Sequence, residues 1–204
     1  MDNNLEIAVL GAGHGGYAMA ADLTLAGHEV NLFNRSPAPI QAIRKTGGIE
    51  ITGEAVYGEG FARIKKATTD VKDAIKDVDV IMIVVPAFGH EYMINKCMPY
   101  LKERQMIVFN TGNFASLRLA NELKKMGKKN LLAETSILIY SSRITGPAGV
   151  FVDGLKQKLP IAAFPAKRSL TISSGGSFVR FGSPKQVFSL VAISGALIFW
   201  ASTN

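Results

Sequence analysis

The sequence predicts a doubly wound α/β fold, in which a mostly parallel β-sheet is covered by helices on both faces. Short apolar runs alternate with segments of helical length from residue 5 to about residue 133, the pattern of strands joined by crossover helices. The most continuous apolar run of the first half is "VDVIMIVV" at residues 78–85, as expected of a central strand buried on both sides. A glycine-rich turn directly follows the first apolar run, which is typical of a strand–turn–helix unit.

Each expected strand is an apolar run that a turn or breaker residue closes. Glycine ends the first run after Leu10, and Pro86 ends the run at 78–85. Short β-branched pieces alternate with glycines at 49–64, and we interpret this region as an inserted hairpin. The strands predicted for the main sheet are residues 5–10, 28–33, 78–85 and 106–110, followed by one that begins at 131–133.

The expected helices carry start and stop signals. Ser36 stands at an N-cap position before Pro37, and Thr69-Asp70 is expected to cap the third helix. Glycines at 27 and 47–48 close the first two helices. The predicted helices cover residues 17–25, 37–45, 71–76, about 90–101 and about 116–126.

Length and composition are those of an ordinary globular protein. The 204 residues suffice for one full domain and part of a second, and 48% of them are hydrophobic. Cys97 is the single cysteine, which excludes an intramolecular disulfide, and we interpret it as a helix residue facing the core. Asp2 and Glu6 stand where a secretory leader would be basic. We therefore expect a reducing, cytoplasmic location.

The net charge of +7 arises at the end of the chain. Residues 154–204 carry six Lys and Arg and no acid, whereas residues 1–153 hold 17 bases against 16 acids. The earlier part shows neither bases clustered on one helix nor bases interleaved with aromatic residues. This distribution argues against a nucleic-acid partner.

The main candidate site is the run Gly11-Ala12-Gly13-His14-Gly15-Gly16. Its first, third and sixth residues match the G-x-G-x-x-G spacing of dinucleotide-binding loops. The first glycine of that pattern makes a tight turn, the second lets the backbone approach a pyrophosphate, and the third lets the helix pack closely. The helix N-terminus then offers free N–H groups to the phosphates. A turn without ligand is the alternative, but the flanking strand and helix favour a Rossmann-type dinucleotide-binding domain.

Asn34, Arg35 and Ser36 follow the second strand, where an NAD-binding protein would carry a carboxylate for the ribose hydroxyls. Arg35 can stack on adenine and pair with a 2′-phosphate, to which Asn34 and Ser36 can donate hydrogen bonds. The alternative is a solvated arginine beside a helix cap. Because no carboxylate is present to repel the extra phosphate, we expect NADP as the cofactor and NAD as the second choice.

Pro86 and Ala87 follow the central strand at the edge where such sheets bind ligands, and they are candidates for an apolar wall against a nicotinamide ring. The alternative is a proline that merely ends a strand. His90 and Glu91 suggest an acid–base pair, but adjacent helix residues point about 100° apart, so only His90 is retained. The histidines and Cys97 lack metal-ligand spacing, and we expect no metal site.

The chain resembles the amino-terminal domain of the octopine/nopaline (opine) dehydrogenase family over about residues 5–166. The resemblance is carried by "VLGAGHGGYAMAADLTLAGHEVNLFNRS", "IMIVVPAFGHE", "ETSILIYSSRITGPAGV" and "LPIAAFPA". The glycine loop is shared with many dehydrogenases. "PAFGHE" and "ETSILIYSSR" are more specific and separate this family from the related glycerol-3-phosphate dehydrogenases and ketopantoate reductases.

This resemblance implies an NAD(P)H-dependent reductive condensation, in which an amino acid and a 2-oxo acid form an imine that hydride reduces to a secondary amine. Positions 11–16 would hold the pyrophosphate, positions 34–36 the adenosine end, and Pro86, Ala87 and Glu134 would lie near the nicotinamide. The family has asparagine at position 14, so His14 is expected to replace one hydrogen-bonding group by another. Two other functions stay open: a non-catalytic NADP(H)-binding module, and a reductase of the glycerol-3-phosphate dehydrogenase or ketopantoate reductase kind.

Residues 167–204 depart from the family. Its members continue into a helical domain that supplies the catalytic histidine, its acidic partner and most substrate contacts, which the sequence after Ala166 does not resemble. We interpret residues 1–166 as the dinucleotide-binding domain and 167–204 as a foreign tail, such as a truncated or frame-shifted product carries. We expect the second domain to be absent and the chain alone to be inactive.

Two expectations about partners follow from the same region. The apolar stretch 187–201 is shorter than the ~20 residues of a spanning helix, which argues against membrane attachment. Without a second domain, residues 150–165 would leave an apolar face exposed, which leaves homo-oligomer formation open.

Overall fold

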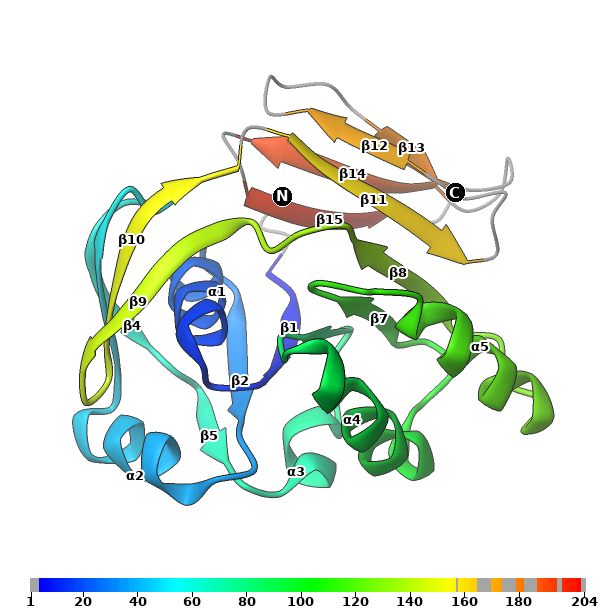
Figure 1. Cartoon of the computed structure of the whole chain (residues 1–204), viewed down its shortest axis with the longest axis horizontal. Helices are drawn as coiled ribbons and strands as arrows, with labels where there is room; N and C mark the ends of the chain where they lie inside the picture. The colour runs from blue at the N-terminus through cyan, green and yellow to red at the C-terminus, as the bar shows by residue number, and fades with distance from the viewer. Residues whose placement is uncertain are drawn as a thin grey trace.

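The computed structural model describes residues 4–156, 158–164, 170–173, 179–181, 187–193 and 196–202. Within them the central sheet has the strand order β12-β11-β8-β7-β6-β1-β2-β5. Its strands are β1 (Glu6–Leu10), β2 (Glu29–Phe33), β5 (Lys66–Thr68), β6 (Val80–Ile83), β7 (Met106–Phe109), β8 (Leu131–Thr135), β11 (Lys158–Phe164) and β12 (Leu170–Ser173). From β8 to β5, every neighbouring pair of strands is parallel. The strand β11 pairs antiparallel with β8 on one side and with β12 on the other. The predicted mostly parallel sheet is confirmed (Figure 1).

Helices cover both faces of this sheet, as predicted. They are α1 (His14–Leu25), α2 (Pro37–Thr46), α3 (Val71–Ile75), α4 (His90–Cys97) and α5 (Ala115–Lys125). Ile7 and Val9 of β1 belong to the core that contains α1 and α2, whereas Ala8 and Leu10 belong to the core that contains α3, α4 and α5. Successive strand residues thus point to opposite faces, and both faces are apolar because both are covered.

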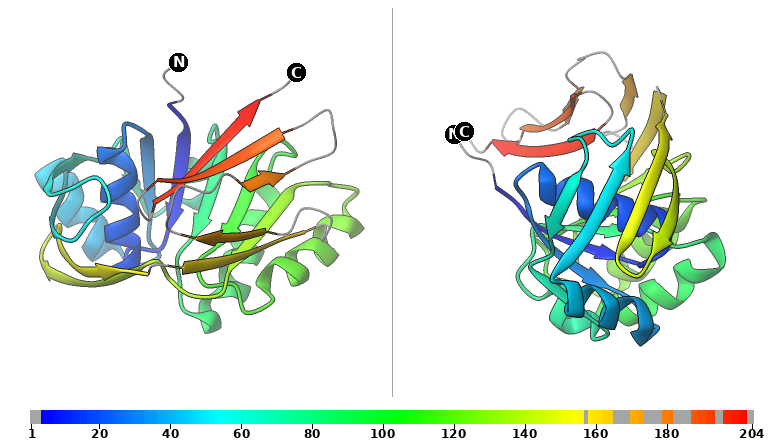
Figure 2. Two further views of the ribbon diagram at one scale, coloured as in Figure 1. Left: turned by 90° about the horizontal axis from the view of Figure 1, so that it is seen from above. Right: turned by 90° about the vertical axis from the view of Figure 1, so that its left-hand side faces the viewer.

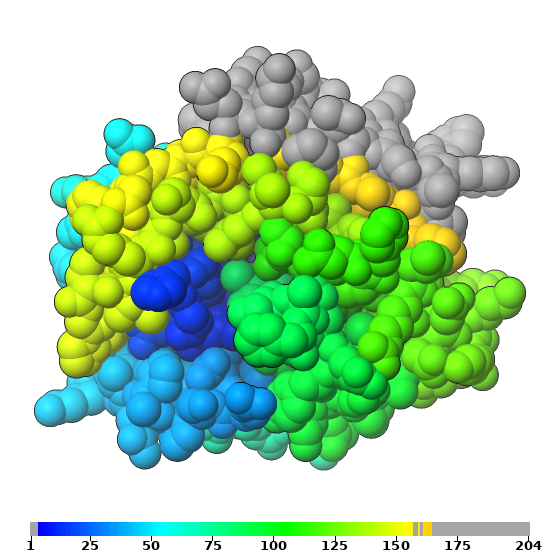
Figure 3. All heavy atoms as spheres, viewed as in Figure 1, coloured from blue at the N-terminus to red at the C-terminus, as the bar shows by residue number. Residues whose placement is uncertain are grey.

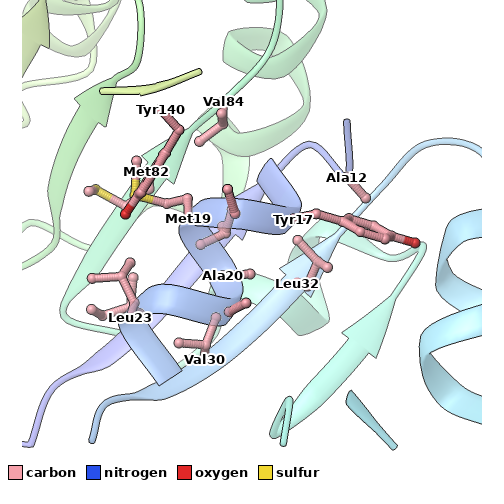
Figure 4. Packing of buried hydrophobic residues seen from close by; sticks show 14 of the residues in the cluster. Ala12, Tyr17, Met19, Ala20, Leu23, Val30, Leu32, Met82, Val84 and Tyr140 are labelled. Atoms are coloured by element: carbon pink, nitrogen blue, oxygen red, sulfur yellow. The ribbon is translucent and has the colours of Figure 1, made fainter. Parts of the chain in front are cut away.

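A second sheet covers the outer side of α1. Its order is β4-β3-β10-β9, with β3 (Gly48–Gly53), β4 (Gly60–Arg63), β9 (Tyr140–Gly146) and β10 (Gly149–Leu155). Figure 2 shows α1 between this sheet and the central one, so every residue of α1 from Gly15 to Leu23 is buried. Tyr140 of β9 packs beside Met19 of α1 and Met82 of β6 (Figure 4). The alanine-rich sequence of α1 suits a helix that is enclosed on all sides.

The predicted hairpin at 49–64 is confirmed by the antiparallel pair β3–β4. The sequence did not predict its partners: β10 pairs parallel with β3, and β9 pairs antiparallel with β10. Helix boundaries also differ. α1 begins at His14 rather than at residue 17, and α4 ends at Cys97, after which Met98–Tyr100 form a 3-10 turn that contains Pro99.

One of the two predicted helix caps is correct. Asp70 Oδ1 accepts a hydrogen bond from Lys72 N at 2.9 Å and so caps α3. Ser36 holds the N-cap position of α2, but its side chain makes no capping hydrogen bond. The helix start therefore depends on Pro37 at the first helical position rather than on the Ser36 hydroxyl.

Cys97 lies in the core, as predicted, with 2% of its surface exposed. Burial raises the pKa of its thiol to about 12, because the thiolate would lose its solvation. Cys97 is therefore a packing residue rather than a nucleophile.

The predicted domain boundary at residue 166 and the acidic Asp2 lie outside the described residues. Beyond the boundary, β12 extends the central sheet, and β13 (Val179–Phe181), β14 (Val187–Ile193) and β15 (Ala196–Ser202) form a sheet of their own. Within the apolar stretch 187–201, the described residues belong to the paired strands β14 and β15. None of the helices in the described segments has the length and apolar content that crossing a membrane requires. Phe164 is 38% exposed at the end of β11, and self-association through this region stays a prediction.

Candidate functional site

The glycine loop between β1 and α1 has the geometry that its spacing predicts. Gly11 has a φ of +117°, and a Cβ on it would overlap the carbonyl oxygen of Val84. A Cβ on Gly16 would overlap the carbonyl oxygen of Gly11, so α1 packs directly on the turn. At Gly13, which is exposed, no atom of the described residues other than its chain neighbours lies within 4 Å of the Cβ position. Packing therefore requires the first and third glycines, while the second leaves backbone open to a ligand.

The loop lies at the floor of a surface hollow. Figure 3 shows dark-blue atoms of the N-terminal segment between the second sheet, α2 and the green segment that follows β6. Because β1 has β2 on one side and β6 on the other, the hollow lies at the point where the strand order reverses, where α/β sheets bind ligands. Ala12 is buried beneath the surface, and a Cβ on Gly15 would overlap the side chain of Leu138.

Asn34 ties the glycine loop to the loop that follows β2. Its Oδ1 accepts a hydrogen bond from Ala12 N at 3.1 Å, and its Nδ2 donates to the carbonyl of Ser36 at 3.0 Å. Asn34 thus fixes both loops by internal bonds, a role that the sequence did not predict for it. A neutral amide holds the place where an acidic side chain would carry charge toward a ribose.

A cavity of 190 Å³ lies beside this junction. Asn34, Arg35 and Ser36 line one side of it, and Val85, Pro86, Phe88, Gly89, Tyr92 and Met93 line the other. The structure therefore brings the predicted residues after β2 together with the predicted Pro86. Ala87 is exposed at the start of the adjoining 3-10 turn (Ala87–Gly89), outside this lining. The lining includes two large aromatic side chains, Tyr92 and Phe88, which no sequence pattern indicated as site residues. Phe88 is 90% exposed.

His14 connects the glycine loop to the second sheet. Its Nδ1 accepts a hydrogen bond from Ile144 N of β9 at 2.7 Å. A ring nitrogen that accepts carries no proton, so this contact places the proton of the neutral ring on Nε2. His14 is a hydrogen-bonding residue, as expected, but the partner lies on a strand 130 residues away rather than within the loop.

We expect the His14→Ala chain to expose the Ile144 amide, because that N–H loses its acceptor. Amide hydrogen exchange at Ile144 should accelerate about fivefold or more, which corresponds to a hydrogen bond of ~1 kcal/mol. The Val9 amide in the central sheet serves as the internal reference and should keep its rate. Unchanged exchange at Ile144 would show that β9 is held to the loop by other contacts.

Glu134 lies at the carboxyl end of β8, next to the N-terminus of α5. Its carboxylate accepts hydrogen bonds from Phe114 N at 3.2 Å, from Ser116 N at 3.1 Å and from Ser116 Oγ at 2.7 Å. A Cβ on Gly112 would overlap the Glu134 side chain. The carboxylate therefore caps α5, which suits the positive end of the helix dipole. No local pattern in the sequence signals this cap.

His90 begins α4 and is buried, with 6% of its surface exposed. Its ring meets the Phe109 ring edge-on at 5.4 Å, and among the described residues its Nε2 has no hydrogen-bond partner. Burial lowers the pKa of His90, with weaker opposing effects from nearby carbonyls and from Glu134. The imidazole is thus neutral near pH 7. Glu91 is exposed and pairs with Arg118 at 2.6 Å, so the two neighbours do not act together.

The described part of the chain contains no group of three His, Cys, Asp or Glu side chains arranged to hold a metal ion. The candidate site consists of the open backbone at Gly13, the junction of two loops that Asn34 fixes, and the cavity with Arg35 at its rim. These features suit a ligand that is long and anionic.

The sheet order, the covering helices and the glycine loop define a Rossmann-type domain. The chain belongs to the ketopantoate reductase PanE/ApbA family, whose model matches residues 7–134. It is also a homologue of the opine dehydrogenase of Arthrobacter sp. (strain 1C), with 33% identity over 164 residues, which cover 79% of this chain and 45% of that protein. The chain spans less than half the length of the curated relatives it matches.

Solved structures show the same fold. Octopine dehydrogenase with NADH and L-arginine matches at a TM-score of 0.70 and 21% identity, over 79% of this chain and 42% of that one. Yersinopine dehydrogenase with NADP⁺ bound matches at a TM-score of 0.67 and 20% identity, over 80% and 42%. The resemblance to opine dehydrogenases stated from the sequence motifs is thereby confirmed, and the family model confirms the relation to the ketopantoate reductases that the sequence analysis named.

Proposed function

We propose that this chain binds NADP(H) in the hollow above the glycine loop and forms the cofactor-binding half of an oxidoreductase of the opine dehydrogenase type. The observation that carries this proposal is the loop geometry. Gly11 and Gly16 are packed against backbone, and Gly13 presents open backbone at the N-terminus of α1. A pyrophosphate needs this arrangement of free N–H groups and unobstructed approach.

The adenosine end fits the cavity beside Asn34. Arg35 lies at its rim, exposed, and no carboxylate follows β2 to repel a 2′-phosphate. Ser36 is exposed and makes no capping bond, so its hydroxyl is free to donate. These features favour NADP(H) over NAD(H). Among the relatives, one solved structure has NADH and another NADP⁺.

The bound nicotinamide would supply hydride, and the residues of this chain would position it. Ala87 at the carboxyl end of β6 would lie beside the ring, with Glu134 and the neutral His90 further along the same edge. Pro86 lines the cavity proposed for the adenosine end, which favours contact with that end over the nicotinamide contact that the sequence led us to expect. The substrates by family would be an amino acid and a 2-oxo acid. Glu134 is committed to capping α5, and His90 is buried, so neither is an exposed acid–base group. We therefore expect the chain alone to bind cofactor with little or no turnover.

The proposal is tested by titrating the purified chain with NADPH and NADH and following nucleotide fluorescence. We expect both to bind, with NADPH about tenfold tighter, because one charge-assisted hydrogen bond to the 2′-phosphate contributes about 1.5 kcal/mol. Binding of neither nucleotide would contradict the proposed function. Ordinary enzymatic oxidation of NADPH by the chain with an amino acid and a 2-oxo acid would contradict the proposed inactivity of the chain alone.

A second candidate function is reduction of a 2-oxo acid without an amine partner. It is favoured by the match of residues 7–134 to the ketopantoate reductase model. The product distinguishes the two functions in any preparation that turns over. Mass spectrometry would find a secondary amine that joins both substrates in the first case and a 2-hydroxy acid in the second.

A further inference from the structure

Two cations lie close to the ring of Tyr92, which lines the cavity beside Asn34. The Arg35 guanidinium, from the loop after β2, lies over the ring with Cζ at 5.4 Å from the centroid. Nζ of Lys96, one turn along α4, lies at 5.8 Å from the same centroid. Both distances are within the range of cation–π attraction, and positions four apart on a helix are neighbours. Tyr92 thus holds two positive charges that come from different elements.

Neither cation has an acidic partner in the described part of the chain. Among the described residues, the side chains of Arg35 and Lys96 make no hydrogen bond and no ion pair. Asp70 is the one acid that lines the neighbouring cavity of 410 Å³, which Tyr92 and Lys96 also line, and it is engaged in capping α3. A cation–π contact engages the charge of the guanidinium and leaves its N–H groups able to donate hydrogen bonds to another group.

A second arginine that contacts an aromatic ring, Arg143, differs from Arg35 in having a carboxylate partner. Arg143 lies over the ring of Phe151 at 4.5 Å, and its guanidinium also pairs with the carboxylate of Asp153. In that case the cation–π contact and the ion pair together compensate the charge of the Arg143 guanidinium. Arg35 has the cation–π contact without a carboxylate partner among the described residues. It lies at the rim of the cavity in which a bound nucleotide would place its phosphate ester.

We propose that Tyr92 is a positioning residue that sets the preference of the site for NADP(H). Its ring fixes the Arg35 guanidinium so that the N–H donors face the adenosine 2′-phosphate, and Lys96 adds a second positive charge on the same ring. This inference rests on the proposed nucleotide site. Without the ring, Arg35 is a flexible surface side chain that must be ordered each time the phosphate binds.

The experiment measures Kd for NADPH and for NADH and uses their ratio, because a general loss of fold changes both. Tyr92→Leu should reduce the preference for NADPH about fivefold, as expected for a cation–π contact of ~1 kcal/mol. Tyr92→Phe keeps the ring and should keep the ratio. Tyr100→Leu is the matched control, because the Tyr100 ring also makes a cation–π contact with a lysine, with Lys72 Nζ at 5.8 Å from its centroid, while the Arg35 contact belongs to Tyr92. It should keep the ratio as well.

A double-mutant cycle separates positioning from an independent contribution of the ring. Arg35→Gln should remove the preference, and adding Tyr92→Leu to it should change the ratio no further. An unchanged ratio in Tyr92→Leu, or an equal loss in Tyr100→Leu, would overturn the inference while the site still binds nucleotide. Binding of neither nucleotide to the unmodified chain would instead overturn the proposed function on which the inference rests.

Discussion

The Gly16→Ala chain is expected to lose about 3 kcal/mol of folding free energy, and with it the glycine loop. A Cβ at this position would overlap the carbonyl oxygen of Gly11, which is backbone and has no rotamer to change. Either α1 must move away from the turn or the turn must open, and both changes disturb a helix that is buried on all sides. Thermal or urea unfolding followed by circular dichroism measures the loss.

Gly13→Ala is the matched variant, because it adds the same methyl group three residues earlier. Apart from its chain neighbours, none of the described residues has an atom within 4 Å of that position, and Gly13 has an extended backbone with φ −85° and ψ −170°, which alanine also adopts. Its folding free energy should stay within about 0.5 kcal/mol of the unmodified chain. Its affinity for NADPH should fall about tenfold, because the methyl group occupies the approach of the pyrophosphate. Equal destabilisation by both changes would contradict the division of roles among the glycines.

Five of the strands of the central sheet, β1, β2, β6, β7 and β8, could be predicted from the sequence because their signals are local. Each of these five is an apolar run, such as the one that Pro86 follows at β6, and the glycine spacing identifies the turn at which α1 begins. The strands β5, β11 and β12 of the same sheet were not predicted; β5, for example, is only three residues long and includes Lys66 and Thr68. The second sheet could not be predicted as a unit. Its central pair joins Glu50 of β3 to Gly149 of β10, two segments about a hundred residues apart, and nothing in either segment specifies the other.

The candidate site shows the same division. Gly11, Gly13 and Gly16 have the geometry that their spacing predicts, because loop conformation depends on those residues themselves. The partners of His14 and Glu134 could not be predicted, since they lie on β9 and at the start of α5. Which side chains meet there depends on how the sheets and helices pack, and only the structure shows it.

Asp22 is a buried charged residue of α1 whose role no motif identifies. It lies on α1 with 1% of its surface exposed. Its carboxylate accepts a hydrogen bond from Tyr57 N at 2.9 Å and another from the Tyr140 hydroxyl at 2.8 Å. These contacts join α1 to the loop after β3 and to β9. Burial raises the pKa of Asp22 above its ordinary value of 3.8, and the two hydrogen bonds offset only part of that rise.

This raised pKa predicts how stability depends on pH. A carboxyl group whose pKa is higher in the folded than in the unfolded chain favours folding when protonated, and that contribution is lost as pH rises. We therefore expect the unmodified chain to lose stability relative to Asp22→Asn as pH rises from about 4 through the native pKa. The loss amounts to about 1.4 kcal/mol for each unit by which the two pKa values differ. Denaturant unfolding of both chains from pH 4 to 8 measures the difference.

Tyr140→Phe provides the decisive comparison, because it removes one hydrogen-bond donor from Asp22 and leaves the ring in the core. The Tyr140 hydroxyl lowers the pKa of Asp22, so its removal should raise that pKa further and extend the loss of stability to higher pH. At pH 7 the variant should be less stable by about 1–2 kcal/mol, since a buried carboxylate loses a partner. If all three chains show parallel pH profiles, the Asp22 carboxyl group is not buried in the folded protein as the structure places it. The expected result is that the free energy of unfolding falls above pH 4 in the two chains that keep Asp22, relative to Asp22→Asn. That result would establish that a buried carboxylate holds α1 to the second sheet.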